Sequence, residues 1–208
     1  VPDDFLEHLS SLLDYLESRL ADYDHLFFRN QVFVQRARGV GVLTREKALK
    51  WSVTGPNLRA TGLAFDVRRD DPYLVYDELD FEVVTEQGGD ALARNLVRRG
   101  ELKQSIRILR QVIERLPSIE GPVRTNIPNP LAWNVPAGEA YTRVESSKGE
   151  LAYYVVSTGG DKPYRVHVRG PSSMHAVQVL EKLAVGSRLE DVAQIMFSLD
   201  ACPPEVDR

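Results

Sequence analysis

Apolar residues recur at three- and four-residue steps in two long stretches of the sequence, and this spacing predicts amphipathic helices. The first stretch covers residues 3–24, where Asp3 or Asp4 can cap the helix start. The second covers residues 90–116 and ends before Pro117, which cannot continue a helix. We expect the two helices to pack together in a bundle. The apolar positions are Phe5, Leu9, Leu12, Leu13, Leu16 and Leu20 in the first stretch and Leu92, Leu96, Leu102, Ile106, Leu109, Ile113 and Leu116 in the second.

Shorter helical patterns have start and stop signals of the same kind. Residues 54–73 contain two glycines and two prolines, so they predict a loop with one helical turn. The expected short helices are 30–38, 45–51 with Thr44 as its cap, a helix from Ser172 or Ser173 to about Leu183, and 188–199.

Two apolar or alternating segments have the pattern of β-strands. Residues 150–157 and 163–169 flank Gly159 and Gly160, and together they predict a β-hairpin. Phe81–Val84 predicts a further short strand.

Proline interrupts regular structure in two places. Five prolines in residues 117–137 predict an irregular segment that follows the surface. Pro203 and Pro204 are expected to exclude helix, so the tail 201–208 is predicted to be extended or turned. The elements together predict one mainly α domain over residues 1–208, a helical bundle with a small β-hairpin.

The composition is that of a globular protein, with 208 residues, 43% hydrophobic, 27% charged and a net charge of −4. The mild negative charge argues against a nucleic-acid-binding module, which usually has a basic face. No stretch approaches the roughly 18 apolar residues that a bilayer-spanning helix needs, so membrane attachment has to run through a partner. Cys202 is the only cysteine, which excludes an internal disulfide and a multi-cysteine zinc or iron–sulfur site in this chain.

The N-terminal residues Val-Pro-Asp-Asp have neither the basic region nor the apolar region of a secretory signal, and they lack an initiator Met. We therefore expect a mature, trimmed or excised fragment. The absence of a signal and the single cysteine fit a reducing, cytoplasmic setting.

Gly39-Val-Gly41 is a fragment of a dinucleotide-binding fingerprint without the third glycine or the preceding strand, so it predicts a helix-ending turn. A run of carboxylates with Arg68 and Arg69 lacks the ligand spacing and central glycine of a calcium loop. We interpret it as a structural ion-pair loop. Its carboxylates are Asp66, Asp70, Asp71, Asp77, Glu78, Asp80 and Glu82.

The histidines lack the sequence spacing of metal ligands, and spacing alone does not indicate a Ser-His-Asp catalytic triad. Each histidine is therefore predicted to be a surface residue. His167 alternates with Arg165 and Arg169, which leaves a basic groove as the alternative there. The four histidines are His8, His25, His167 and His175.

The C-terminal charged residues form the most unusual cluster in the sequence. A lone tail is normally frayed, but this one directly follows an apolar helix and is stiffened by two prolines, so we expect it to dock. Docked charges need partners, which makes the cluster a functional candidate. Its members are Asp200, Cys202, Glu205, Asp207 and Arg208.

Several blocks, in order and over nearly the whole chain, carry a family resemblance. The most specific are Thr54–Gly62, Asp66–Arg68 and Asp71–Phe81; the others are Asn30–Val42, Glu145–Leu151 with Tyr154, Lys162–Arg165, Val168–Ser172, and the close from Ser198–Asp200 to Val206–Arg208. They resemble the 49 kDa subunit family of NADH-quinone oxidoreductase, the respiratory complex I. The family's subunit is about twice this length, so the resemblance implies its C-terminal half, without the family's quinone-binding His and Tyr.

The family shares its fold with the large subunit of nickel–iron hydrogenases, which hold metal with two CxxC pairs, the second near the C-terminus and followed by His. The resemblance puts Cys202 at the first position of that last pair, Glu205 at the second and Arg208 at the histidine. One thiolate and one carboxylate cannot hold two such metals in the same way. The resemblance thus implies a cavity that has lost its metal and receives quinone. The implied wall residues are Asp200, Cys202, Glu205, Asp207 and Arg208; family members commonly have Val in place of Cys202, which argues against redox use of this thiol.

By this resemblance the chain is part of the quinone-site subunit of a proton-pumping, complex I-type oxidoreductase, and it is not a complete enzyme alone. Quinone is the substrate, and iron–sulfur clusters, with flavin and NADH if used, lie on other subunits; this chain holds no metal. The implied partners are the small iron–sulfur subunit, the 30 kDa-type subunit and a membrane-anchor subunit, on the cytoplasmic side of the membrane. Two alternatives stay open, the large subunit of a membrane-bound nickel–iron hydrogenase-related complex and a non-catalytic scaffold fragment.

Overall fold

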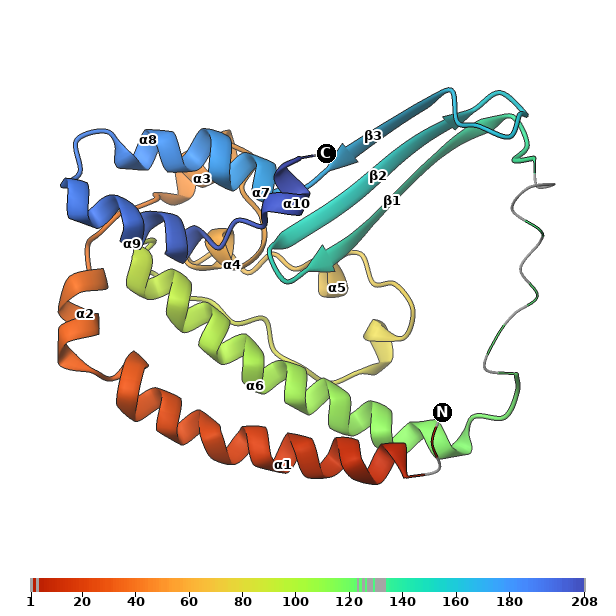
Figure 1. Ribbon diagram of the computed structural model, residues 1–208, viewed down its shortest axis with the longest axis horizontal. Helices are drawn as coiled ribbons and strands as arrows, with labels where there is room; N and C mark the ends of the chain where they lie inside the picture. The colour runs from red at the N-terminus through yellow and green to blue at the C-terminus, as the bar shows by residue number, and fades with distance from the viewer. Residues whose placement is uncertain are drawn as a thin grey trace.

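The computed structural model describes residues 2, 4–122, 124, 126, 129 and 134–207. Two long helices, α1 (Phe5–Tyr23) and α6 (Ala91–Arg115), run alongside each other, and the shorter helices and a three-stranded sheet lie on the other side of α6 (Figure 1). The mainly α architecture predicted from the sequence is therefore confirmed. Within the described residues, no helix has the length and apolar character needed to cross a bilayer.

Both long helices were predicted within two residues of their ends. They meet through Leu13 and Leu20 of α1 and Ile106 of α6, which form a small apolar cluster. Asp90 caps α6 by accepting a hydrogen bond from the Ala93 N–H at 2.8 Å, and a 3-10 turn at Leu116–Ser118 follows it. Asp4 stands at the N-cap position of α1 without a side-chain cap bond, and Asp3 lies outside the described residues. A π-helical turn, Asp24–Phe28, continues α1.

The other expected helices are present, with small differences in their bounds. The 54–73 segment contains two short helices where the sequence predicted one turn, because Asp66 caps a second turn through the Arg68 N–H at 3.0 Å. A π-helical turn, Met174–Val179, joins α7 to α8. The short helices are α2 (Gln31–Ala37), α3 (Arg45–Lys50), α4 (Gly55–Arg59), α5 (Val67–Asp70), the 3-10 turn Tyr76–Glu78, α7 (Pro171–Ser173), α8 (Leu180–Ala184), α9 (Leu189–Leu199) and α10 (Pro203–Val206).

The main hydrophobic core lies among the short helices and joins residues far apart in the sequence. Residues from the loop around α3 pack against the C-terminal helices, so the two ends of the chain share one core. The buried members of this core are Leu43, Ala48, Val53, Leu58, Val179, Ile195 and Leu199.

The sheet is an antiparallel meander in the order β1-β2-β3, with strands Gly138–Ser146, Gly149–Ser157 and Arg165–Arg169. The β2–β3 pair confirms the predicted hairpin, and β1 is an additional strand. Figure 1 shows the sheet reaching away from the helices, with one end held near α4, α5 and α10.

The sheet joins the helices through a close approach of two glycines. Gly55 begins α4 with φ of +67°, and a Cβ atom there would lie 2.3 Å from the Gly149 Cα. The Glu150 N–H donates to the Thr54 hydroxyl at 3.1 Å beside this contact. Glycine at both positions therefore lets helix and strand backbones touch.

The prediction of a strand at Phe81–Val84 is wrong, since no strand is present there. The neighbouring backbone donors are taken by side chains of α6. The Asp80 N–H donates to Gln111 Oε1 at 2.8 Å, and the Glu82 N–H donates to Gln104 Oε1 at 3.0 Å. The segment is thus bound to a helix, not to a neighbouring strand.

The prediction that Pro203 and Pro204 exclude helix is also wrong, because they begin the single-turn helix α10. The first positions of a helix have no intrahelical partner for their N–H groups, so proline is tolerated there.

The ion-pair interpretation of the acidic stretch is confirmed. Asp71 pairs with Arg143 at 2.8 Å, Glu78 pairs with Arg115 at 3.1 Å, and Asp80 pairs with Arg107. The turn expected at Gly39 and Gly41 is present as well, with both residues at positive φ after α2.

The buried part of the ion-pair network centres on Arg59. Its guanidinium is 1% exposed and lies 2.5 Å from Glu101, 2.8 Å from Glu145 and 3.6 Å from Asp66. Asp66 is also bound by Arg68 at 2.6 Å. Burial opposes ionisation of Asp66, but the hydrogen bonds from Arg68 and the charge of Arg59 outweigh it, so the pKa of Asp66 is lowered.

Candidate functional site

The C-terminal end of α9 is held by two arginines of α6, the buried Arg94 and the half-buried Arg98. Arg94 donates from Nε and Nη2 to the Ser198 hydroxyl at 3.0 and 2.8 Å. Arg98 donates to the carbonyl oxygens of Ser198 at 2.8 Å and Leu199 at 3.2 Å. The last carbonyls of a helix have no intrahelical donor and carry partial negative charge, so guanidinium groups stabilise this end.

Burial lowers the pKa of Arg94, and Arg98 nearby adds to the effect. Burial likewise lowers the pKa of Arg98, although Asp200 opposes this. The Asp200 carboxylate therefore favours the charged form of the Arg98 guanidinium.

Asp200 leaves the helix in the left-handed conformation, with φ of 56° and ψ of 48°. Its Oδ2 atom lies 3.3 Å from Arg98 Nε and 2.5 Å from Lys148 Nζ. A non-glycine residue rarely adopts this backbone, although Asp tolerates it better than most. The two cations fix the carboxylate where the chain turns from α9 into the tail.

The tail is docked by α7. Glu205 Oε2 accepts hydrogen bonds from the Ser172 N–H at 3.1 Å and from the Ser172 hydroxyl, while the Cys202 N–H donates to that hydroxyl at 3.0 Å. The Ser173 hydroxyl donates to the Glu205 carbonyl oxygen at 3.1 Å. Residues 200–205 are therefore bound at both ends.

A largely apolar, open cavity of about 590 Å³ lies against this segment. The polar side chains in its wall are His175, Asp200 and Asp207. The rest of the wall is apolar, which suits a flat hydrophobic ligand with a few polar atoms. The other lining residues are Ala176, Leu180, Met196, Phe197, Leu199, Ala201, Pro203 and Val206.

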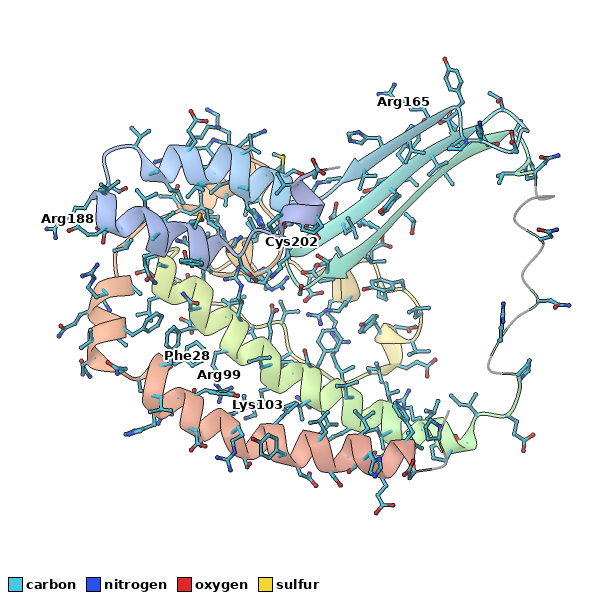
Figure 2. The ribbon with its side chains drawn as sticks, in the orientation of Figure 1. Phe28, Arg99, Lys103, Arg165, Arg188 and Cys202 are labelled. Carbon is cyan, nitrogen blue, oxygen red and sulfur yellow. The ribbon has the colours of Figure 1, made fainter. Side chains whose placement is uncertain are left out.

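A second cavity, of about 490 Å³, also has Asp200 in its wall and is lined by several charged side chains. Arg98, Glu101 and Glu145 line it together with Asp200. Arg99, also in this wall, lies between α6 and the end of α1 and donates two hydrogen bonds to Asp24 (Figure 2). Asp200 thus lines both an apolar cavity and a charged one.

His175 is fully buried within the π-helical turn after α7. Its Nδ1 atom lies 3.0 Å from Asn57 Nδ2. Burial, together with the positive charges of Arg98, Arg169 and Arg94, lowers the pKa of His175 to about 3, so the ring is neutral at physiological pH. The prediction that it is a surface residue is wrong, whereas His8, His25 and His167 are exposed as predicted.

Of the predicted wall residues, Asp200 and Asp207 line the apolar cavity. Cys202 and Glu205 belong to the same docked segment but are not among the lining residues. Figure 2 shows Cys202 beside α10. Arg208 lies outside the described residues. The assignment of these residues to a quinone site stays a prediction.

Three residues were missed, namely His175, which lines this cavity, and Arg98 and Lys148, which pair with Asp200. For His175 a signal existed, because it precedes the buried Val179 by four positions on one helical face. For the two cations no local signal existed, since they reach Asp200 from α6 and from the β1–β2 turn.

The residues do not fit a metal centre of the hydrogenase type. Cys202 is the only thiol of the chain, and Oε2 of Glu205 accepts two hydrogen bonds from Ser172. No group of three or more potential His, Cys, Asp or Glu ligands gathers anywhere in the described part of the chain. The donor set is too small and too hard for two borderline-soft metals.

The fold and this segment define a class of protein, a mainly helical subunit whose C-terminal residues wall an open apolar cavity next to a buried charge network. The comparisons with known proteins agree with that class. The model of the family described as respiratory-chain NADH dehydrogenase, 49 Kd subunit, matches residues 1–134 and 130–208. The chain therefore belongs to this family.

The chain is similar to subunits of several respiratory enzyme complexes. An NADH-quinone oxidoreductase subunit of Thermosipho melanesiensis is 48% identical over 94% of this chain and 53% of its own length. An F(420)H(2) dehydrogenase subunit of Methanosarcina mazei is 41% identical over 100% of this chain and 56% of its own. A chain in the structure of the membrane-bound sulfane sulfur reductase, an archaeal respiratory membrane complex, superposes with a TM-score of 0.92 at 49% identity, covering 99% of this chain and 56% of that one. The chain spans about half the length of the curated relatives it matches.

Proposed function

We propose that the chain is part of the quinone-site subunit of a proton-pumping NADH-quinone oxidoreductase and forms one wall of the quinone cavity. In this proposal an iron–sulfur cluster on a neighbouring subunit supplies two electrons. The quinone takes up these electrons and two protons and becomes quinol. Flavin and NADH, where used, bind on other subunits.

The observation that carries the proposal is the apolar cavity with Asp200 at its edge. Its volume of about 590 Å³ and its apolar wall suit a quinone ring. Reduction of the ring builds up negative charge until protons arrive, and fixed neighbouring charges control how costly that intermediate is. Arg98 and Lys148, paired with Asp200, supply positive charge at this edge.

The family assigns the chain to a subunit of a multi-subunit respiratory complex, and the partners follow as part of the proposal. We infer contacts with the small iron–sulfur subunit, the 30 kDa-type subunit and a membrane-anchor subunit, and a peripheral position on the cytoplasmic side of the membrane. No nucleic-acid partner is proposed.

A nickel–iron hydrogenase-related complex is the second candidate. The similarity to a chain of the sulfane sulfur reductase shows that a chain of this fold also occurs in a complex named for an acceptor other than quinone. The donor set around Cys202 and Glu205 argues against a metal centre, however, so quinone reduction remains the better-supported function.

The test uses the full-length subunit in its assembled complex. Asp200→Asn is expected to lower quinone reduction about tenfold, equivalent to about 1.4 kcal/mol of barrier, because Arg98 and Lys148 lose their counter-charge. Electron transfer to ferricyanide, a water-soluble acceptor that needs no quinone cavity, should stay unchanged.

The matched control is Asp161→Asn, which removes an equal charge from an exposed turn between β2 and β3. It should leave quinone reduction unchanged. If Asp200→Asn reduces quinone as fast as the unsubstituted complex, the cavity is not the quinone site. If the unsubstituted complex assembles but reduces no quinone at all, the result would favour the scaffold or hydrogenase-related alternatives.

A further inference from the structure

Each of the two long helices has a stripe of exposed apolar side chains beside the face through which the helices meet. Figure 1 shows α1 at the edge of the molecule, with α6 along one side of it. The exposed residues recur at four- and seven-residue steps, so they line up along each helix. Each of them is between 36% and 51% exposed. The members are Phe5, Leu12, Leu16 and Tyr23 on α1, and Leu102, Leu109 and Leu116 on α6 and the turn that follows it.

The two stripes lie on the same side of the helix pair. Successive helical residues are about 100° apart, so Leu12 and Asp14 lie on opposite flanks of the line through which α1 meets α6. Leu109 and Arg110 lie on opposite flanks of the corresponding line on α6. The Arg110 guanidinium donates to Asp14 Oδ1 at 2.8 Å and to Glu17 Oε2 at 2.7 Å, so these charged residues share one side of the pair. The two apolar stripes therefore share the other side, and together they form one surface, the α1–α6 face.

The α1–α6 face has the character of an interior surface. Helical domains bury their apolar stripes between two packed layers, and a pair of antiparallel helices supplies only one of them. A contiguous exposed apolar patch of this kind marks a surface that another protein segment covers. The face also reaches the charged cavity, because Leu102 and Ser105 of α6 line that cavity together with Asp200. A segment bound on the face would therefore border this cavity as well.

The length of the relatives indicates which segment covers the face. This chain covers 53% and 56% of the two relatives named above and 56% of the solved chain. A full-length subunit of this family therefore has nearly as many residues again. Because those residues are covalently joined to this half, their effective concentration at the face is about millimolar, well above that of a second copy of the subunit.

We propose that the α1–α6 face is the docking surface for helices of the other half of the full-length subunit, which complete a four-helix bundle with α1 and α6. The seven-residue steps suit this occupant, because they keep an apolar stripe in contact with a helix that runs nearly along it. The inference follows from family membership and from the exposed stripes. It goes beyond the proposed function and does not depend on quinone being the substrate.

The test introduces single cysteines into the full-length subunit and follows maleimide labelling of each by peptide mass spectrometry. Leu12→Cys and Leu109→Cys probe the α1–α6 face. Ser11→Cys is the matched control, because Ser11 is exposed and lies about half a turn from Leu13, on the side of α1 away from α6. In the isolated monomeric subunit, the two probes should react at least about tenfold more slowly than the control, since labelling requires local opening of the bundle.

Equal labelling rates for the probes and the control in the isolated subunit overturn the inference. Slow labelling that appears only in the assembled complex also overturns it, because a neighbouring subunit then covers the face. Slow labelling that is lost when a dimer dissociates on dilution assigns the face to a second copy and overturns it as well.

Hydroxyl-radical footprinting of the unsubstituted full-length subunit gives a second measurement in case a cysteine variant does not fold. Tyr23 on the α1–α6 face and Tyr15 on the side of α1 away from α6 are similarly exposed in this half, at 48% and 57%. Tyr23 should be oxidised several-fold more slowly than Tyr15, and similar rates overturn the inference. Neither measurement involves quinone, so failure of the proposed function is seen separately, in the quinone reductase assay.

Discussion

Replacing Arg59 by Met removes the positive centre of the buried ion-pair network while keeping much of the side-chain volume. Glu145 is 3% exposed and Asp66 is 1% exposed, so water cannot take over the role of the guanidinium for them. Asp66 keeps its pair with Arg68, and Glu101 is partly exposed and can hydrate. The charge left without compensation is therefore mainly that of Glu145.

Breaking a buried pair by removing one partner costs about 3–5 kcal/mol. The Val67 N–H still donates to Glu145 Oε2 at 3.1 Å, which places the expected loss near the lower end, about 3 kcal/mol at pH 8. An Arg→Met change in an exposed ion pair should lower the free energy of unfolding by only about 0.5 kcal/mol. Arg115, which pairs with Glu78 at the surface, provides this matched control.

The pH dependence gives a second, independent check. Burial raises the pKa of Glu145 even with Arg59 beside it, and loss of Arg59 should raise this pKa further. A carboxyl whose folded pKa exceeds its unfolded value of about 4.3 loses stability as pH rises through the folded pKa. The stability deficit of Arg59→Met should therefore be smaller at pH 5 than at pH 8.

The assay is urea denaturation of the full-length subunit at both pH values, followed by tryptophan fluorescence. A loss below about 1 kcal/mol at pH 8, indistinguishable from that of Arg115→Met, would refute the reasoning that Glu145 cannot be hydrated. A deficit that is equal at pH 5 and pH 8 would show that the loss is one of packing and not of charge.

Two further pairs of substitutions test the packing by the same denaturation assay. Gly55→Ala puts a methyl group 2.3 Å from the Gly149 Cα at a positive φ, so it should lower the free energy of unfolding by more than about 2 kcal/mol. The control Gly160→Ala, whose Cβ would have its nearest neighbour at 4.0 Å, should change it by less than about 0.5 kcal/mol. Equal effects would contradict the close helix–strand contact. Leu13 is 2% exposed between α1 and α6, so Leu13→Ala should lower the free energy of unfolding by about 2–5 kcal/mol. The neighbouring Leu12 is 51% exposed, so Leu12→Ala should lower it by less than about 1 kcal/mol. The opposite order would mean that the other face of α1 meets α6.

The helices could be predicted because their apolar spacing, caps and stops are local. Thr44 caps α3 as the sequence indicated, and Pro117 lies just past the end of α6 as predicted. Strand β1 could not be predicted in this way, since most of its residues are exposed and its apolar positions do not alternate. Its pairing partner β2 determines it, and pairing is a tertiary property.

The docked tail was expected from its two prolines and its position after an apolar helix, but its partners were not. Ser172 meets Glu205 and Cys202 across about thirty positions of sequence, a contact that no local pattern encodes. The prediction that His175 lies on the surface was wrong because it rested on polarity and not on the four-residue spacing to Val179. The hydrogen-bond partner of His175, Asn57, lies more than a hundred residues earlier in the chain.

The geometry of the apolar cavity depends on two independent sets of hydrogen bonds, one at each end of the segment that forms its wall. Arg98 and Asn57 bind the Leu199 carbonyl oxygen and fix the direction in which the chain leaves α9. Ser172 binds Glu205 and fixes the tail a few residues later. Because a short segment bound at both ends cannot shift without breaking one of these contacts, the cavity wall is pre-organised before any ligand arrives. Asp200 stands between the two points, where its left-handed backbone is held by Arg98 and Lys148, so this carboxylate couples the shape of the apolar cavity to the charge of the polar one.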